Sequence, residues 1–332
     1  MNNTFPYYVT NYFKEYLPKV KSFSSNTIKS YKETMIQLIN YFESNKIDYS
    51  DIQNIDSDVI NNFMLFLEEE NNLSISSRNQ RLSAIHSLFK YIQKRELSYF
   101  DKCSQILSIE YKRTPVTIVS YLSMDEIKIL LSIPNVKDDN EFRHLMILTL
   151  LYETGARVSE LINIKLNDIN FNNTPYIILY GKGNKTRSVP ISRDVSNMLK
   201  IYLNRFNINE QDDYILKNRL NYKITRDGVQ YIIDTYVNKA KEKYPNYYNS
   251  KITNHSFRHS KAMHLLEAGV NLVYIRDILG HKSITTTEVY AKTNPEIKRK
   301  AIEDNSQNIK VNDKYGTKVK NDLLNWLKNY VE

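Results

Sequence analysis

Apolar residues recur at helical spacing through the first hundred residues of the chain. In the range 27–43 the apolar positions are separated by 4, 3 and 4 residues, and similar spacing recurs at 60–67 and across 77–95. Such spacing places apolar side chains on one face of a helix. We therefore predict that residues 5–105 are helical. The three stripes are Tyr31, Met35, Leu38 and Phe42; Ile60, Phe63 and Leu67; and Leu82, Ile85, Phe89 and Ile92.

The segment 110–121, EYKRTPVTIVSY, interrupts this pattern. It contains a proline and has no helical stripe, so we predict an extended linker. Ser123 follows, with Glu126 three residues later, which is the capping-box arrangement at the start of a helix. The predicted organisation is a helical domain over 1–110, a linker over 111–121 and a second domain over 122–332.

The second domain combines helices with strand-like runs. Residues 176–180 and 187–191 have the composition of strands, and residues 181–186 between them are typical of a hairpin loop. Residues 168–171 are a candidate for a third, short strand. The predicted fold class is mainly α, with a small three-stranded antiparallel sheet in the second domain. Helices are expected near 142–152, 194–206, 226–242, 256–268, 271–279 and 284–292.

The basic residues are unevenly distributed. The net charge is +9, but residues 1–110 hold 12 Lys and Arg against 13 Asp and Glu, and the remainder holds 34 against 24. A domain this basic favours a polyanionic partner, with nucleic acid first. The alternative is a lysine-rich surface that serves only solubility.

One predicted helix of the first domain carries basic residues and no acidic ones. A near-neutral domain can therefore still present a basic face to DNA, although a solvated helix face would look the same. The candidate DNA-binding residues in 77–95 are Arg78, Arg81, Lys90, Lys94 and Arg95.

The composition indicates the cellular compartment in which the protein is expected. The 332 residues are 41% hydrophobic, which indicates a globular protein, and no window approaches the ~20 apolar residues of a membrane-spanning helix. The first residues lack the features of a secretory signal. The single cysteine, Cys103, fits a reducing compartment and a buried position. We expect a cytoplasmic protein, on the bacterial nucleoid, with no membrane partner.

Six residues have the chemistry needed to cut a phosphodiester without a metal. Arginines can grip phosphate oxygens, and lysine, histidine and tyrosine can supply acid, base and nucleophile. Four of them also have a plain structural interpretation: an arginine paired with Glu160, a turn lysine, a helix-cap histidine, and one tyrosine among 26. Lys185 and Arg187 compete for the role of the lysine and are further candidates for DNA contact. The six are Arg157, Lys182, His255, Arg258, His281 and Tyr290.

Two other kinds of site are disfavoured. His255, His259 and His264 suggest a metal, but the HExxH pattern of zincins is absent and an arginine lies among them. The string GKGNKT at 181–186 lacks the GxxxxGK[ST] pattern of a P-loop. We expect neither a metal nor another cofactor.

Taken in order, the six residues and their strings resemble the signature of tyrosine recombinases of the phage-integrase type, in the two-domain, Xer-like form. The strings are GARVSEL, GKGNK, HSFRH and LGH, and Tyr290 follows His281 by nine residues. The resemblance covers the second domain and extends weakly to the first, which resembles the family's core-binding, SAM-like domain. Phe257 and Lys292 depart from the usual pattern, which has a smaller aliphatic residue and a histidine there.

The resemblance implies a role for each residue. Tyr290 would attack the scissile phosphate and become linked to the DNA 3′-phosphate. Arg157, supported by Glu160, and Arg258 would hold the phosphate oxygens, with a further hydrogen bond from His281. Lys182 would protonate the departing 5′-oxygen, and His255 would assist proton transfer. Neither ATP nor a metal is needed.

The resemblance also implies partners: double-stranded DNA with inverted-repeat core sites, and a homotetramer on paired sites. Integration or excision of a mobile element is preferred over resolution of chromosome dimers. Two other classes stay open, a type IB-like topoisomerase and a DNA-binding regulator with a vestigial site. An apolar helix at 320–332, suited to docking on a neighbour, argues against the topoisomerase, and the intact set of six argues against the regulator.

Overall fold

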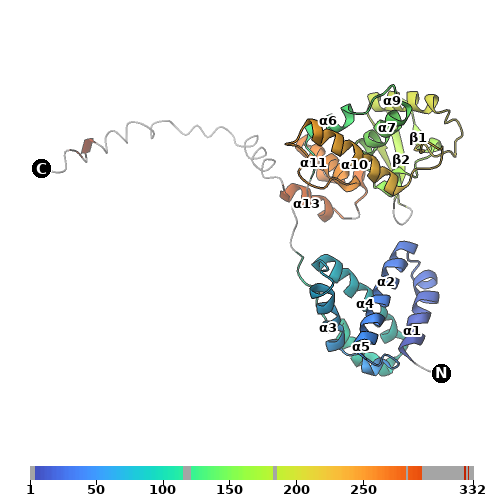
Figure 1. Cartoon of the computed structure of the whole chain (residues 1–332), viewed down its shortest axis with the longest axis vertical. Coiled ribbons are helices and arrows are strands. Elements are labelled where there is room, and N and C mark those ends of the chain that lie inside the picture. Colours follow the sequence, from blue (N-terminus) through green and yellow to red (C-terminus); the bar gives the residue numbers. More distant parts are fainter. Residues whose placement is uncertain are drawn as a thin grey trace. The chain divides into compact units, whose positions relative to one another are not determined.

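The structure, a computed structural model, describes residues 4–114, 121–181, 185–281 and 283–293, together with positions 325, 326 and 328. The chain forms two compact units, Met1–Thr117 and Ile118–Glu332, whose boundary falls inside the range 111–121 (Figure 1). Apart from the three helical positions 325, 326 and 328, the predicted helix over 320–332 lies outside the described residues, as does Lys182.

The first unit is helical, as its apolar stripes predict. Met35, Leu38 and Phe42 are buried, and the other two stripes join them in one core that includes the fully buried Cys103. The helix that carries the second stripe, α3 (Ser57–Glu69), is capped by Asp56, which accepts a hydrogen bond from Val59 N at 2.8 Å. The elements are α1 (Phe5–Asn11), η1 (Tyr12–Val20), α2 (Ser25–Ser44), η2 (Ile52–Asn54), α3 (Ser57–Glu69), α4 (Ile75–Arg95), η3 (Leu97–Tyr99) and α5 (Phe100–Leu107).

The start of the predicted linker is bonded to the first unit. Two hydrogen bonds join the side chain of Asn79 to the backbone of Lys112. Asn79 Nδ2 donates to the carbonyl of Lys112 at 2.7 Å, and the N–H of Lys112 donates to Asn79 Oδ1 at 3.1 Å. Arg78 donates to the carbonyl of Glu110 at 3.2 Å. The first residues of the predicted linker are therefore hydrogen-bonded to α4.

The second unit places a small sheet beside a helical layer (Figure 1). The strands form an antiparallel sheet in the order β1-β2-β3, with Ile177 opposite Val189, which confirms the predicted fold class. Ser123 caps the first helix of this unit with the predicted capping box. The elements are α6 (Met124–Ser132), α7 (Asp139–Thr154), α8 (Val158–Leu161), η4 (Leu166–Asp168), β1 (Ile169–Asn170), β2 (Tyr176–Tyr180), β3 (Thr186–Pro190), α9 (Arg193–Arg205), α10 (Arg226–Lys243), α11 (Asn254–Glu267), α12 (Leu272–Leu279) and α13 (Thr285–Thr293).

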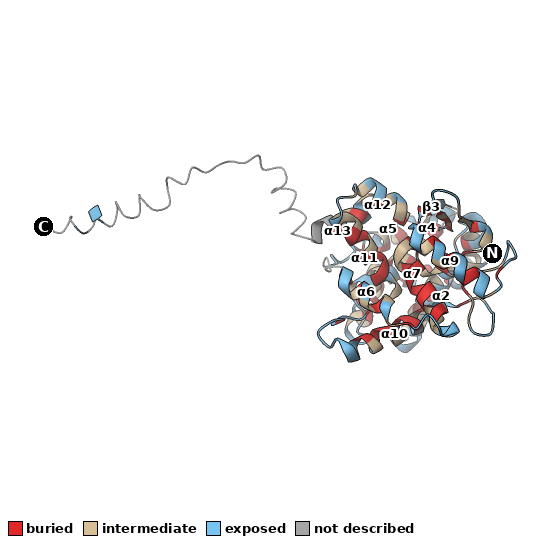
Figure 2. Ribbon diagram, turned by 90° about the horizontal axis from the view of Figure 1, so that it is seen from above, coloured by how far each residue is buried: buried red, intermediate tan, exposed pale blue. Residues whose placement is uncertain are grey.

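Helix α7 forms the centre of the second core. It is buried along most of its length, and it packs against α9 and α11 (Figure 2). Helix α7 ends at Gly155, whose φ of +55° favours glycine. The chain then turns directly into α8, so Arg157 stands at the junction of two helices that the core holds in place.

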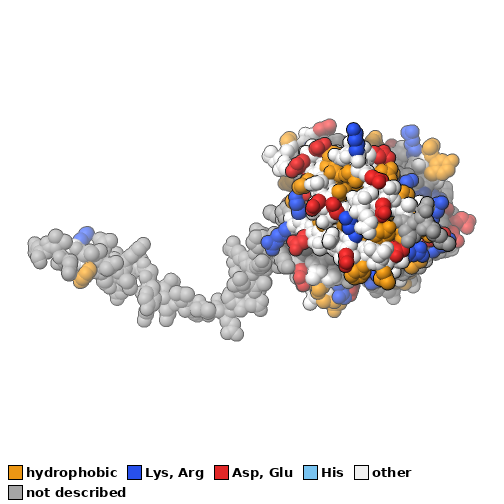
Figure 3. Space-filling model, turned by 90° about the horizontal axis from the view of Figure 1, so that it is seen from below, with side chains coloured by type: hydrophobic (Ala, Val, Ile, Leu, Met, Phe, Trp, Pro, Cys, Tyr) orange, Lys and Arg blue, Asp and Glu red, His pale blue; other side chains and the backbone are white. Residues whose placement is uncertain are grey.

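The charges on one face of the protein and the lengths of the described helices are two further features of the structure. Acidic, basic and apolar side chains are interspersed on the face drawn in Figure 3, so the described basic residues do not gather there. Among the described residues, no helix combines the length and the apolar character needed to cross a bilayer.

Candidate active site

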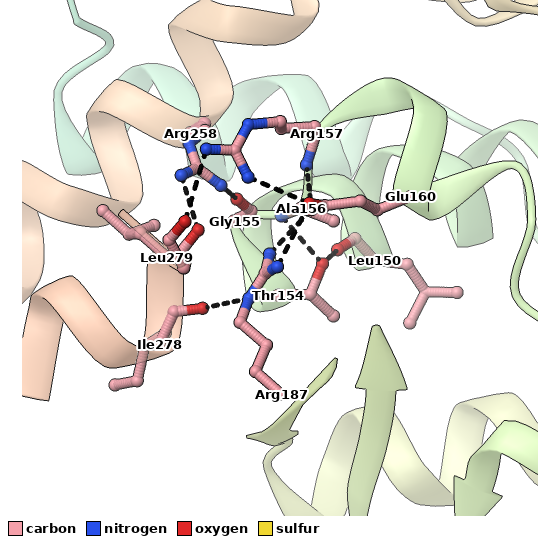
Figure 4. Close-up of polar contacts among 11 residues, drawn as sticks. Leu150, Thr154, Gly155, Ala156, Arg157, Glu160, Arg187, Arg258, Ile278 and Leu279 are labelled. Atoms are coloured by element: carbon pink, nitrogen blue, oxygen red, sulfur yellow. Dashed lines mark hydrogen bonds and ion pairs between the residues drawn. The ribbon is translucent and has the colours of Figure 1, made fainter. Parts of the chain in front are cut away.

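Three arginines from different parts of the second unit converge on the end of α12 (Figure 4). Arg187 Nε donates to the carbonyl of Ile278 at 2.7 Å, Arg258 Nη2 to Leu279 at 2.6 Å and Arg157 Nη2 to Gly280 at 3.4 Å. The last carbonyls of a helix have no partner within the helix and carry partial negative charge. The end of α12 therefore orients three guanidinium groups.

Glu160 joins two of these arginines. Its side chain is buried and accepts from Arg157 Nη1 at 2.9 Å and from Arg187 Nη1 and Nη2 at 3.1 and 2.7 Å. Burial acts to raise the pKa of Glu160, but the hydrogen bonds from Arg187 and Arg157 outweigh it, so the pKa is lowered. Three positive charges thus surround one carboxylate, and the excess favours an anion.

Arg258 is the most deeply buried of the three arginines. It is 3% exposed, and its Nη1 also donates to the carbonyl of Gly155 at 2.7 Å. Burial, followed by the charges of Arg157 and Arg187, lowers its pKa to about 10, so it stays cationic at neutral pH. The side chain of Arg157, by contrast, is 37% exposed and can be reached by a ligand.

Gly280 makes the close approach of Arg187 possible. It caps α12 with a φ of +66°, and a Cβ at this position would lie 2.8 Å from Arg187 Nη1. Both the backbone conformation and the space therefore require glycine.

Tyr290 lies among histidines of the same unit. It is 3% exposed, its hydroxyl is 2.8 Å from His259 Nδ1, and its ring stacks on that of His281 at 6.3 Å between centroids. The other contact of His281 joins its Nδ1 to Thr287 Oγ1 at 2.9 Å.

The environment keeps these groups neutral. Burial raises the pKa of Tyr290, although Arg258 and Arg157 oppose the change. Burial, with His255 and Arg258, lowers the pKa of His259 to about 4. Burial, with the arginines, also lowers the pKa of His281 to about 4. At neutral pH both imidazoles and the tyrosine hydroxyl are uncharged, beside a cationic cluster.

Comparison with known proteins identifies the family. The model of the phage integrase family matches residues 120–296, which is more than half of the chain. The chain belongs to the phage integrase family. The N-terminal SAM-like domain of phage integrases matches residues 10–96.

Relatives of this integrase-family chain cover most of its length. Tyrosine recombinase XerD of Staphylococcus epidermidis is 31% identical over 274 residues, which are 81% of this chain and 88% of that protein. The putative integrase/recombinase y4rC of Sinorhizobium fredii is 29% identical over 298 residues, 88% of this chain and 89% of that one. The chain is accordingly an enzyme of the tyrosine recombinase class, which breaks and rejoins DNA at specific sites.

Solved structures share the fold. The integrase of transposon Tn1549, bound to transposon right end DNA, aligns with a TM-score of 0.69 at 18% identity, over 90% of this chain and 98% of that one. The XerH recombinase bound to palindromic difH substrate aligns with a TM-score of 0.68 at 21% identity, over 83% and 79%.

The structure brings five of the six candidate residues of this family member into one unit. His255 lies in the first turn of α11, is exposed, and has a pKa lowered by partial burial and by Arg258 and Arg157. Lys182 lies outside the described residues, but its predecessor Gly181 lies at the cluster: a Cβ there would be 3.2 Å from Glu160 Oε1.

Some candidate DNA-binding residues have other partners. Arg78 is buried and pairs with Glu68 at 3.1 Å, which leaves it no surface for DNA and corrects the expectation from the sequence. Arg81 donates to the carbonyl of Ser30 and to Thr34, facing α2. Arg187 is committed to Glu160 and α12. The candidates that remain exposed are Lys90, Lys94, Arg95 and Lys185.

Sequence reasoning missed one residue of the site. His259 follows Arg258 directly and belongs to the three histidines that suggest a metal in the sequence, but it contacts Tyr290, whereas His264 bonds Tyr152 at 2.9 Å. In the described part of the chain, no three His, Cys, Asp or Glu side chains gather as metal ligands would. The departure at Phe257 is a fully buried core residue.

Proposed function

We propose that this protein cuts a strand of double-stranded DNA with Tyr290, keeps the 3′-phosphate as a phosphotyrosine, and passes it to the 5′-hydroxyl of another strand. The observation that carries the proposal is the placement of a buried tyrosine within the electrostatic reach of Arg258 and Arg157 of the same chain. Nucleophile and anion-binding groups thus belong to one subunit, and each subunit is equipped to cut.

The arginine cluster would bind the scissile phosphate. Arg258 and Arg157 are oriented by backbone carbonyls and by Glu160 before any ligand arrives, so little reorganisation is needed when charge develops on the phosphate oxygens. His281 is neutral and adds a hydrogen bond, and His255, exposed beside the arginines, assists proton transfer at the phosphate. Because one phosphoester replaces another, neither ATP nor a metal is required.

Lys182 would protonate the departing 5′-oxygen. Two observations on its neighbours support this role: Gly181 lies against Glu160, and Gly181 N–H donates to the carbonyl of Lys185 at 2.8 Å, which closes the hairpin beside the arginines. Gly181, the residue that precedes Lys182, therefore lies beside the arginine cluster.

A substrate with sulfur at the bridging 5′ position tests this role. A thiolate leaves without a proton, so Lys182→Ala should be slow on ordinary DNA and should recover on the sulfur substrate, measured as covalent complex formed in a single turnover. Lys185→Ala is the matched control. Recovery of Lys185→Ala alone would transfer the role to that residue.

The DNA would carry inverted-repeat core sites, with four protomers on two paired sites. Two duplexes exchanged strand by strand need four tyrosines, and each chain contributes one. The biological setting that we propose is integration or excision of a mobile element, supported by the relative named integrase/recombinase and by the fold shared with a transposon integrase. We place the reaction in the bacterial cytoplasm, where the buried thiol of Cys103 would stay reduced.

Tyr290→Phe tests the central step. The variant should bind its DNA with nearly unchanged affinity, yet form no SDS-resistant complex with a nicked suicide substrate, because the hydroxyl is the nucleophile. Tyr274→Phe, at a tyrosine that is 66% exposed on the neighbouring α12, is the control and should react at the wild-type rate. A covalent complex in Tyr290→Phe would refute the assignment.

A further inference from the structure

The hydroxyl of Tyr290 lies within hydrogen-bond distance of an imidazole nitrogen. His259 Nδ1 lies 2.8 Å from Tyr290 Oη, and the contact joins α11 to α13 inside the second unit. His259 immediately follows Arg258, so one turn of α11 presents a phosphate-binding group and an imidazole to the same small region.

Both partners of this bond are uncharged at neutral pH. Tyr290 is protonated at neutral pH because burial raises its pKa, and His259 is neutral because burial and its cationic surroundings lower its pKa. With the ring proton on Nε2, the hydroxyl donates to Nδ1, and this is the tautomer that the proposal below requires. This is the arrangement in which a neutral imidazole can accept a proton from the nucleophile.

We propose that His259 takes the proton of Tyr290 when the tyrosine attacks DNA and returns it when the strands are rejoined. The proposal deepens the proposed function and rests on it. The neighbouring histidines are placed differently: His281 Nδ1 contacts Thr287 and its ring lies parallel to the tyrosine ring, and the ring of His255 is 6.3 Å from that of His259.

The step balances. Tyr290 Oη forms a bond to phosphorus as its proton moves to His259 Nδ1, while the bond from phosphorus to the 5′-oxygen breaks and that oxygen takes a proton from the general acid. Rejoining reverses each transfer: the 5′-hydroxyl attacks, Oη leaves, and the imidazolium returns its proton to Oη.

The surroundings would couple this transfer to DNA binding. An imidazolium at His259 would be destabilised by burial, by His255 and by Arg258. A bound phosphodiester brings a negative charge against Arg258 and offsets that repulsion. The tyrosine would thus keep its proton until a phosphate occupies the arginine cluster.

His259→Gln provides the first test. Glutamine can hold the tyrosine hydroxyl through its carbonyl oxygen but cannot take its proton. We expect single-turnover cleavage of a nicked suicide substrate to fall about 100-fold, within the range of general-base effects, with DNA affinity unchanged. His264→Gln is the matched control, because His264 lies on the same helix and bonds the hydroxyl of Tyr152 in a similar half-buried pair; it should cleave at the wild-type rate.

Chemical rescue separates proton transfer from a structural role. Added imidazole should raise the cleavage rate of His259→Gly, and substituted imidazoles should do so in order of their basicity. Sulfur at the bridging 5′ position, which we expect to relieve Lys182→Ala, should not relieve His259→Gln. Wild-type cleavage by His259→Gln, or a DNA-binding His259→Gly that imidazole does not accelerate, would overturn the proposal. If the wild-type protein forms no covalent complex, the proposed function itself fails.

Discussion

Each unit of this protein contains a glutamate bound by basic side chains, and the two clusters differ in what they leave free. In the first unit Glu68 accepts from Arg78 at 3.1 Å and from Lys112 at 2.7 Å. Nη1 of Arg78 donates to Asn79 Oδ1 and to the carbonyl of Glu110. This cluster fastens the start of the linker to α3 and α4, and its arginine is 5% exposed.

In the second unit one carboxylate, Glu160, lies among three guanidinium groups. The end of α12 orients all three, and the side chain of Arg157 is 37% exposed. An arginine bonded to a glutamate is therefore no sign of a site by itself. Excess positive charge, oriented in advance and reachable by a ligand, distinguishes the cluster that we assign to phosphate binding from the one that serves the fold.

The largest expected difference between the clusters is in catalysis. Arg258→Lys keeps a positive charge but cannot donate to Gly155 and Leu279 and still face a phosphate with a planar fork. Cleavage in a single turnover should fall about 10²- to 10³-fold, as for loss of one donor to a transition state.

Arg78→Lys is the control for this change, because its arginine is similarly buried and also donates to a backbone carbonyl but lies in the first unit. It should cleave near the wild-type rate. Similar losses in the two variants would mean that the effect at Arg258 comes from the fold rather than from contact with the phosphate.

Removal of the carboxylate should separate the clusters by stability. Glu160→Gln leaves Arg157 and Arg187 without a counter-charge beside Arg258, and unfolding in urea should show a loss of about 2–4 kcal/mol, near the lower end for broken buried ion pairs because Arg157 is partly exposed. Glu68→Gln should cost about 1 kcal/mol or less, since its partner Lys112 is 45% exposed. Equal losses of unfolding free energy would show that the excess positive charge around Glu160 does not destabilise the protein when the carboxylate is removed.

The sequence predicts the fold well because buried faces leave periodic marks in it. The stripe through Met35, Leu38 and Phe42 is buried as expected, and the Ser123–Glu126 capping box forms. Helix ends are equally local, and Gly280 occupies the left-handed position that its place after α12 suggests. These features depend on neighbours within a few residues, so a single sequence contains enough information.

The partners of charged residues are not local, and they were predicted less well. Arg78 is a basic residue on a helix, and its burial depends on Glu68 and Glu110, from α3 and from the start of the linker. The position of Arg187 in β3 does not distinguish it from a surface residue in the sequence, yet its side chain bonds to Glu160 and to the end of α12. The motif resemblance located the residues proposed for catalysis, whereas only the tertiary structure assigns each arginine its acceptor.

The smallest predicted effect concerns the glycine beside Arg187. Gly280→Ala should strain a φ of +66° and place a methyl group 2.8 Å from Arg187 Nη1, which must shift away from Glu160 and Ile278. We expect a loss of about 1–3 kcal/mol in stability, combining left-handed strain with crowding, and cleavage that is slower by about tenfold.

Gly269→Ala isolates the contribution of the backbone. Gly269 has a φ of +80°, and a Cβ there would meet no atom within 4 Å. This variant should lose about 1–2 kcal/mol from strain alone and should cleave at the wild-type rate. Urea unfolding and single-turnover cleavage of the two variants, measured together, decide the point. If both variants lose the same stability and neither loses activity, the contact between Gly280 and Arg187 does not position the cluster. Backbone strain, which both variants share, would then account for the whole loss of stability, and displacement of the Arg187 guanidinium would contribute nothing.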